Sequence, residues 1–142
     1  RRFEYKGSLG DVTVIDDYAH HPTEIRATLS AAKDYPHDEL WVIFQPHTYT
    51  RTKALLLEFA KALTLADHVV LADIYAARET NTIGISSEDL QKQILELGTP
   101  CEYFPTFDEI ENYLLSNCEE GDVLITMGAG DVVNIGEHLL GK

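Results

Sequence analysis

Short apolar runs alternate along the chain with segments of helical periodicity. Five runs of four or five residues are rich in β-branched or aromatic side chains, the pattern of strands buried on both faces of a sheet. Residues 2–6, in which Phe3 and Tyr5 alternate with polar neighbours, predict a further strand at a sheet edge. The five apolar runs are residues 12–15, 41–44, 68–72, 101–104 and 123–126.

Between these runs, apolar residues recur every three or four positions, as they do on the buried face of a helix. Pro22 suits the first turn of the first predicted helix. Ser86 with Asp89, and Thr106 with Glu109, have the spacing of helix-capping boxes. The predicted apolar faces are Ile25, Leu29 and Ala32; Leu55, Phe59, Leu63 and Ala66, after Thr52; Leu90, Ile94 and Leu97; Ile110 and Leu114; and Val132, Ile135 and Leu139.

This repeated strand–helix order predicts an α/β fold: a Rossmann-like, open and mostly parallel sheet with helices on both faces. The 142 residues suit one domain with a core of its own. No apolar run approaches the roughly 20 residues that cross a bilayer, and the first residues do not have the pattern of a signal peptide. We therefore expect a cytoplasmic protein. Because the chain starts directly in a predicted strand, we also expect it to be part of a longer protein.

Charge and cysteine content narrow the classes of partner. The 24 acidic residues against 11 basic ones give a formal net charge of −13. This charge argues against nucleic acid and anionic membranes, because both are held by clustered Lys and Arg. Cys101 and Cys118 are far apart and fit neither a disulfide framework nor a metal-binding CxxC pair. We expect both to be buried free thiols.

Polar loops follow four of the predicted strands, at the edge where parallel strands end and ligands of α/β proteins gather. They are DDYAHHPTE (16–24), QPHTYTRT (45–52), DIYAARETNTIG (73–84) and MGAGD (127–131). A carboxylate can accept two ribose hydroxyls, and an arginine can hold a carboxylate or phosphate by a paired fork. A histidine can hydrogen-bond a substrate near neutral pH. The first two loops hold Asp16, Asp17, Tyr18, His20, His21, His47, Tyr49 and Arg51.

These features also have structural interpretations. Asp16 or Asp17 could cap the following helix, and Arg51 could be a surface residue at a helix start. The three histidines of the first two loops could bind zinc, but no pair has helical or knuckle spacing, so no metal is assigned. The Gly-Ala-Gly of residues 128–130 resembles half of a dinucleotide fingerprint and is a weak NAD signal. It favours a close backbone approach at a helix start, and no phosphate-binding Gly-x-x-x-x-Gly-Lys-Ser/Thr loop occurs.

The loops resemble those of the Mur ligases. VIDDYAHHPTEIRATLSAAK (14–33) is similar to the segment that opens the third domain of that family. FQPHTYTRTKAL (44–55), DIYAARE (73–79) and MGAGD (127–131) resemble its alanine-adding branch. RRFEYKG, at the start, resembles the junction with the central ATPase domain. The resemblance covers essentially the whole chain and implies a single carboxy-terminal domain, residues 1–142, without the UDP-binding and ATPase domains of the family.

The resemblance implies an ATP-dependent, amide-forming ligase of peptidoglycan synthesis. In this reaction ATP phosphorylates the lactyl carboxylate of UDP-N-acetylmuramate, and the amine of L-alanine attacks the acyl phosphate. Magnesium would be held mainly by the central domain. The third domain would close over the other two and contribute ATP ribose contacts and the amino-acid pocket. We expect the isolated chain to be folded but inactive.

The resemblance also implies site residues, position by position. Asp17 matches the carboxylate that binds the ATP ribose. His20, His47 and Arg51 match positions that line the incoming alanine, with Arg51 holding its carboxylate, and Tyr18 would border the same pocket. Holding the amine against the acyl phosphate is catalysis by orientation. No general base and no metal ligand are assigned, although His20 is a possible base.

The sequence departs from the family pattern at two positions. Many relatives have Arg at the place of Thr48, so one cationic contact to substrate is missing or supplied elsewhere. Many also have Gly at the place of Ala19, a difference expected to change little. The rival within the family is the ligase that recycles a tripeptide onto the same UDP-sugar, and Tyr18 with the loop QPHTYTRT favours the alanine enzyme over it. A stand-alone nucleotide- or amino-acid-binding module, an NAD-dependent enzyme and a pure interaction domain are the alternatives from other classes.

Overall fold

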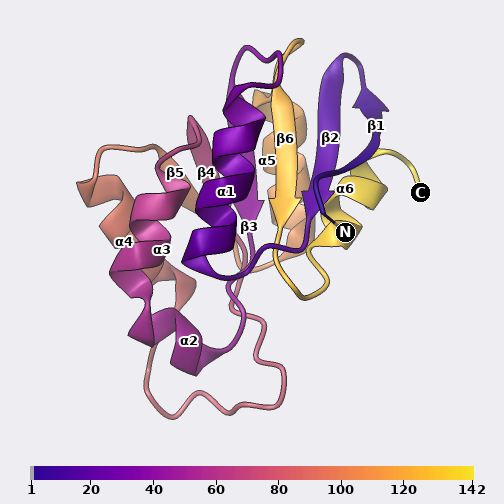
Figure 1. Ribbon diagram of the computed structural model, residues 1–142. Coiled ribbons are helices and arrows are strands. Elements are labelled where there is room, and N and C mark those ends of the chain that lie inside the picture. The colour runs from indigo at the N-terminus through magenta and orange to yellow at the C-terminus, as the bar shows by residue number, and fades with distance from the viewer. Residues whose placement is uncertain (1) are drawn as a thin grey trace.

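One sheet of six strands runs through the computed structural model, which describes residues 2–142 (Figure 1). The strand order is β1-β2-β6-β3-β4-β5, with β1 antiparallel to β2 at the edge and all other neighbours parallel. The predicted α/β fold is confirmed, and the edge strand predicted at residues 2–6 is found shifted along the chain, at Glu4–Leu9. The strands are β1 (Glu4–Leu9), β2 (Val12–Asp17), β3 (Leu40–Phe44), β4 (His68–Leu71), β5 (Cys101–Tyr103) and β6 (Val123–Met127).

Helices cover both faces of the sheet, as predicted. α1, α3 and α4 lie on one face, and α5 and α6 lie on the other (Figure 1). α2 lies beyond the carboxyl ends of the strands, next to the long loop that follows β4 (Figure 1). The helices are α1 (Pro22–Lys33), α2 (Tyr49–Ala54), α3 (Leu56–Leu63), α4 (Ser87–Glu96), α5 (Phe107–Asn117) and α6 (Val133–Leu139).

Alternate residues of each central strand enter one of two hydrophobic cores, which explains why the apolar runs are uninterrupted. From β3, Val42 and Phe44 join the core under α1, α3 and α4, whereas Trp41 and Ile43 join the core under α5 and α6. Phe44 is fully buried, and its ring lies 5.5 Å from that of Phe59 in α3. The central strands are thus fixed from both sides, and so are the starting points of the loops at their ends.

The helical region after β3 differs from the prediction. The helix predicted by the periodicity from Leu55 to Ala66 is found as α3, which begins at Leu56, but a further helix that was not predicted, α2, precedes it and ends at Ala54. Leu55 leaves helical geometry, with φ −116° and ψ 24°. Because residues 49–54 have no apolar face, their sequence gives no periodic signal for α2.

The helix after β2 is capped by His21 and not by either aspartate. His21 Nδ1 accepts a hydrogen bond from the Thr23 N–H at 3.2 Å, and the Glu24 carboxylate accepts one from the His21 N–H at 3.2 Å. The two bonds form a capping box. The capping role considered for Asp16 or Asp17 is therefore wrong, because His21 directly precedes the helix whereas the aspartates end the strand.

The two predicted capping boxes differ in outcome. The box of Ser86 and Asp89 is confirmed at the start of α4. Thr106 caps α5 by accepting a hydrogen bond from the Glu109 N–H at 3.2 Å. The Glu109 carboxylate, however, accepts from the Thr106 hydroxyl at 3.1 Å. The α5 cap therefore lacks the return bond to the backbone that completes a box.

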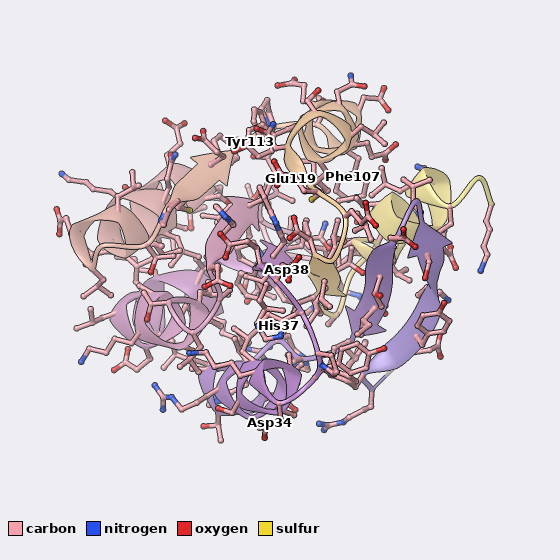
Figure 2. The ribbon with its side chains drawn as sticks, turned by 90° about the horizontal axis from the view of Figure 1, so that it is seen from above. Asp34, His37, Asp38, Phe107, Tyr113 and Glu119 are labelled. Carbon is pink, nitrogen blue, oxygen red and sulfur yellow. The ribbon has the colours of Figure 1, made fainter. Side chains whose placement is uncertain are left out.

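The amino edge of the sheet is closed by hydrogen bonds to one buried carboxylate. Asp122 is 3% exposed and accepts from the Glu39 N–H and the Trp41 indole N–H, each at 3.1 Å, and from the Glu119 N–H at 2.8 Å. Figure 2 looks onto this edge, with Glu119 and Asp38 on neighbouring connections. The amino edge is therefore tied together by its own side chains.

The expectation that both cysteines are buried free thiols is confirmed in part. Both cysteines are free; Cys101 is buried, as expected, whereas Cys118 is half-buried. Burial raises the pKa of each thiol to about 12. Within residues 2–142, no helix combines the length and the hydrophobicity that a membrane span requires.

Candidate functional site

The four polar loops meet at the carboxyl edge of the sheet, as predicted. The second and third loops are joined by hydrogen bonds from Thr48 N to Tyr75 O and from Tyr75 N to Pro46 O, both 2.8 Å long. The second and fourth loops are joined by Gln45 Nε2, which donates to Asp131 Oδ1 at 2.8 Å. The first and fourth loops leave the neighbouring strands β2 and β6. The loops therefore form one continuous surface at this edge.

Four rings form a row across the first three loops, which we call the ring row: Tyr18, His20, His47 and Tyr75. Their centroids are 5.3, 5.9 and 5.6 Å apart in that order. Tyr18 meets His20 edge to face at 81°, whereas His47 and Tyr75 are stacked with 16° between their planes. The ring row thus brings together three of the four residues expected to line the alanine, and Arg51 is the fourth.

Three buried side-chain atoms in the described part of the chain have no hydrogen-bond partner, and all belong to the second loop. They are Gln45 Oε1, His47 Nδ1 and Arg51 Nη1. The amide oxygen can only accept, the guanidinium nitrogen can only donate, and the imidazole nitrogen can do either. Leaving such a group unpaired costs about 1–3 kcal/mol. A ligand that carries both an acceptor and a donor would satisfy them.

His47 is held uncharged at neutral pH. Burial is the largest cause that lowers its pKa below the ordinary value, followed by the positive charge of Arg51 and by His20. Glu79 acts in the opposite direction but more weakly. An uncharged His47 can accept a hydrogen bond or a proton from a substrate amine.

Arg51 lies in the first turn of α2, and two side chains from outside the helix hold that turn. The Glu79 carboxylate accepts from Tyr49 N at 2.7 Å, Thr50 N at 3.0 Å and the Thr50 hydroxyl at 2.7 Å. The bond from the Thr50 hydroxyl is the largest cause that lowers the Glu79 pKa. Thr48 accepts from Arg51 N at 3.3 Å and has φ 66°, which is unfavourable for a β-branched residue.

Asp17 is 2% exposed, and its carboxylate is engaged within the fold. It accepts hydrogen bonds from Phe3 N at 2.9 Å, Ala19 N at 2.8 Å and the Thr28 hydroxyl at 3.0 Å. The neighbouring Asp16 is fully buried. The carboxylate expected to bind the ATP ribose therefore lies at the site edge but already ties the residue before β1, the first loop and α1 together.

The glycines of the fourth loop allow the close backbone approach that the sequence favours. A Cβ at Gly130 would lie 2.5 Å from Gln45 Oε1 and 2.7 Å from the Tyr75 ring. A Cβ at Gly128 would lie 2.9 Å from the Gln45 carbonyl oxygen. All three distances are too short for a real side chain, so the fourth loop packs against the second and third only because these positions are glycine.

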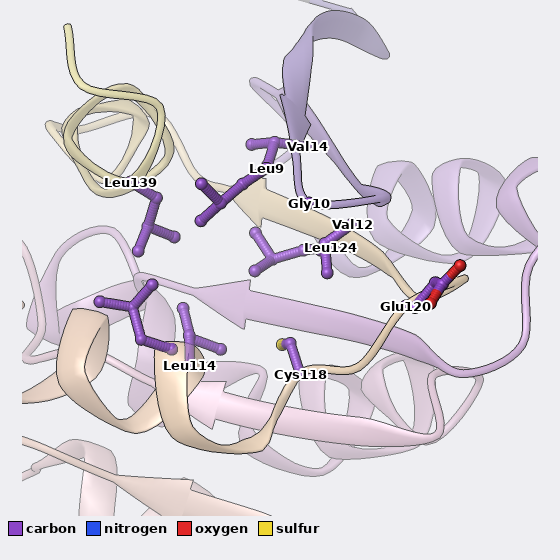
Figure 3. Close-up of a pocket in the computed structure, with 10 residues that line it drawn as sticks. Leu9, Gly10, Val12, Val14, Leu114, Cys118, Glu120, Leu124 and Leu139 are labelled. Carbon is purple, nitrogen blue, oxygen red and sulfur yellow. The ribbon is translucent and has the colours of Figure 1, made fainter.

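An apolar pocket of about 200 Å³ lies elsewhere, between the β1–β2 hairpin, α5 and α6 (Figure 3). Figure 3 shows Leu9, Leu114 and Leu124 turned toward its interior, with Cys118 and Glu120 nearer the amino edge. None of the three unpartnered buried atoms of the described chain belongs to it. The side chains that line the pocket are aliphatic apart from Cys118 and Glu120, and none of them carries a positive charge that could hold a carboxylate, so we place the candidate site at the loops.

Sequence reasoning assigns no role to Gln45, Tyr75 or Glu79, yet these residues hold the site together. The available signal is their position, since each lies in a polar loop that follows a strand. Their partners, however, are in other loops and cannot be read from spacing. Among residues 2–142, His, Cys, Asp and Glu side chains nowhere gather in a group of three or more that could hold a metal ion.

Comparison with known proteins gives the family. The model of the family described as "Mur ligase, glutamate ligase domain" matches residues 1–130. The UDP-N-acetylmuramate–L-alanine ligases of Agathobacter rectalis and Lachnoclostridium phytofermentans are 66% and 61% identical to the whole chain. The chain covers 31% and 30% of these proteins, so it spans about a third of the length of the curated relatives it matches.

Solved structures agree with this result. The UDP-N-acetylmuramate-alanine ligase of Thermotoga maritima is 31% identical with a TM-score of 0.80, and a murein peptide ligase of Psychrobacter arcticus is 28% identical with a TM-score of 0.82. Each match covers 99% of this chain and 29% of the other. A ligase domain from Haemophilus ducreyi, solved by itself, is 25% identical with a TM-score of 0.73, covering 99% of this chain and 98% of that one. The chain belongs to the Mur ligase family.

Proposed function

We propose that the chain is the carboxy-terminal domain of an ATP-dependent ligase that joins L-alanine to UDP-N-acetylmuramate, and that it supplies the alanine pocket. The observation that carries the proposal is the set of unpartnered atoms of Gln45, His47 and Arg51 beside the ring row. Free alanine presents a carboxylate that needs donors and an amino group that needs acceptors. The names of the relatives that are 66% and 61% identical to the chain support alanine as the amino acid.

Arg51 is the residue proposed to hold the alanine carboxylate. Its Nη1 is buried and lacks an acceptor, while its helix turn is held from outside by Glu79 and Thr48. A guanidinium binds a carboxylate through two parallel charge-assisted hydrogen bonds, which fix orientation as well as position. The carboxylate of the substrate would therefore be placed by a side chain whose own backbone is restrained.

His47 is proposed to face the amino group of alanine. The attack on the acyl phosphate requires an uncharged amine, and the amine loses a proton as the amide forms. An imidazole with a lowered pKa can accept a hydrogen bond from that amine, and Nδ1 of His47 has no other partner. His20, next in the ring row, stays a possible base. Tyr18, 44% exposed, would border the pocket on the far side of His20.

The nucleotide contacts are a separate part of the proposal. Asp17 could reach the ATP ribose only by exchanging one of its three internal donors, because its carboxylate is buried. In residues 2–142 no cluster fits magnesium, and the sequence has no phosphate-binding loop, so we assign no residue of this chain to the metal or the phosphates. Those groups would belong to the remainder of the longer enzyme.

The tripeptide-recycling ligase is the second candidate. Its support is the murein peptide ligase structure, which is as similar in fold as the alanine ligase structure, with TM-scores of 0.82 and 0.80. The sequence relatives at 66% and 61% identity carry the alanine name and favour the first candidate. A stand-alone binding module is the third possibility, and it would bind an amino acid without the other domains.

The proposal is tested with a full-length ligase that contains this chain. The KM for L-alanine is measured for the wild type, Arg51→Ala and Arg51→Lys, with the exposed Arg26→Ala in α1 as the matched control. Loss of the two hydrogen bonds from the guanidinium to the alanine carboxylate should raise the alanine KM by about 10- to 100-fold in Arg51→Ala. The rise should be smaller in Arg51→Lys, which keeps the positive charge. The ATP KM should not change. Equal alanine KM values in Arg51→Ala and Arg26→Ala would remove Arg51 from the pocket.

A further inference from the structure

Tyr75 is the second ring, besides His20, that contacts His47 in the ring row. Its ring is stacked on the His47 ring, with centroids 5.6 Å apart and 16° between the planes, and the residue is 38% exposed. The two residues are also joined through their backbones, because Tyr75 N donates to Pro46 O and Tyr75 O accepts from Thr48 N, both at 2.8 Å. The Tyr75 backbone is therefore hydrogen-bonded to the residues immediately before and after His47.

The Tyr75 ring is confined from a second direction by the fourth loop. A Cβ at Gly130 would lie 2.7 Å from Tyr75 Cδ2 and 2.5 Å from Gln45 Oε1. The space at Gly130 is thus filled by the tyrosine ring and the glutamine amide. Gln45 in turn donates to the Asp131 carboxylate at 2.8 Å, which holds the fourth loop in place. The Tyr75 ring therefore lies against both the His47 ring and the backbone of the fourth loop.

We propose that Tyr75 is a positioning residue for the alanine step, which fixes the His47 ring plane, and that Gly130 provides the space the tyrosine needs. The inference rests on the proposed function, because it assigns Tyr75 a role in the same pocket. An imidazole on a loop can turn about two side-chain torsions, and the contact with the Tyr75 ring opposes rotation of the His47 ring plane. His47 is proposed to accept a hydrogen bond from the alanine amine, and such a bond weakens steeply when its donor and acceptor are out of line, so a fixed ring plane supports the binding of alanine.

The confinement also predicts what Gly130→Ala does. The added methyl group would meet the Tyr75 ring and the Gln45 amide at distances that require one of them to shift. Neither side chain needs to touch alanine for this shift to reach His47, because the ring stack transmits it. Gly130→Ala should therefore imitate a Tyr75 variant, although it adds atoms instead of removing them.

The experiment uses a full-length ligase containing this chain. The KM values for L-alanine and ATP and the kcat are measured for Tyr75→Leu, Tyr75→Phe and Gly130→Ala. Tyr35→Leu is the matched control, since Tyr35 is also 38% exposed but lies between α1 and β3, away from the four loops. We expect Tyr75→Leu and Gly130→Ala to raise the alanine KM about tenfold, with the ATP KM unchanged. Tyr75→Phe keeps the ring and should restore the wild-type alanine KM.

A double-variant cycle separates positioning from general weakening of the fold. If Tyr75 acts through His47, Tyr75→Leu should have no further effect on the alanine KM in a His47→Ala background. The same tenfold effect in both backgrounds would overturn the inference, as would an unchanged alanine KM in Tyr75→Leu. A Tyr35→Leu variant that behaves like Tyr75→Leu would overturn it too. Arg51→Ala is run alongside: if it leaves the alanine KM unchanged, the proposed pocket itself has failed, whatever Tyr75 does.

Discussion

Replacing Asp17 by asparagine should destabilise the fold, because three buried donors depend on its carboxylate. Oδ1 accepts from Ala19 N, whereas Oδ2 accepts from Phe3 N and from the Thr28 hydroxyl. Asparagine has one acceptor oxygen, and its NH₂ group would face at least one of these donors. Each lost bond to a charged acceptor is worth about 1.5–3 kcal/mol, and a buried donor left without a partner costs about 1–3 kcal/mol.

We therefore expect Asp17→Asn to lower the free energy of unfolding by about 2–4 kcal/mol, since part of the network can relax. For a domain of this size the melting temperature should fall by roughly 6–15 °C. Urea unfolding of the 142-residue chain, followed by circular dichroism, measures the change, with the exposed Asp34→Asn as control. A loss below about 0.5 kcal/mol, equal to that of the control, would refute the reasoning. The carboxylate would then be free in solution to take a ribose.

Two further predictions concern titratable groups. The pKa of His47 is lower in the fold than in the unfolded chain, so the unfolded state binds the extra proton first as the pH falls below about 6.5. The urea midpoint should therefore fall between pH 7 and pH 5. His47→Asn should flatten the dependence of the urea midpoint on pH, and an identical pH profile in the variant would contradict this prediction. The second prediction concerns the cysteines: burial leaves Cys101 and Cys118 almost without thiolate at pH 8, so both should react slowly with a disulfide reagent until urea unfolds the chain. Rapid labelling of Cys101 in the folded chain would contradict the buried position.

The strands and their arrangement could be predicted because burial on both faces leaves an uninterrupted apolar run, as at residues 41–44 and 123–126. The placement of the polar loops at one edge follows from the parallel order of those strands. The amphipathic helices α1, α4 and α5 could be predicted equally well, because each buries one face. These features depend on the periodicity of apolar residues, which can be read from the sequence without the structure.

The missed features depend on partners from distant parts of the chain. The first turn of α2 is held by Glu79, which belongs to another loop. The sequence of residues 49–54 therefore does not by itself predict that helix. Tyr75 gains its position from His47 and Gly130, which are 28 and 55 residues away in the sequence. The burial of Asp17 likewise follows from Phe3 and Thr28 closing over it. Spacing cannot report contacts that exist only after the loops have met.

The central claim is that this domain serves a ligase whose amino substrate is L-alanine. The most direct test uses a full-length ligase that contains this chain, together with ATP and UDP-N-acetylmuramate. Radioactively labelled L-alanine is added to one reaction and the labelled tripeptide to another, and the labelled amide product is measured in each. We expect ATP-dependent amide formation with alanine, sharply weakened by Arg51→Ala, and little product with the tripeptide. Product formed from the tripeptide but not from alanine would contradict the claim while leaving the family unchanged.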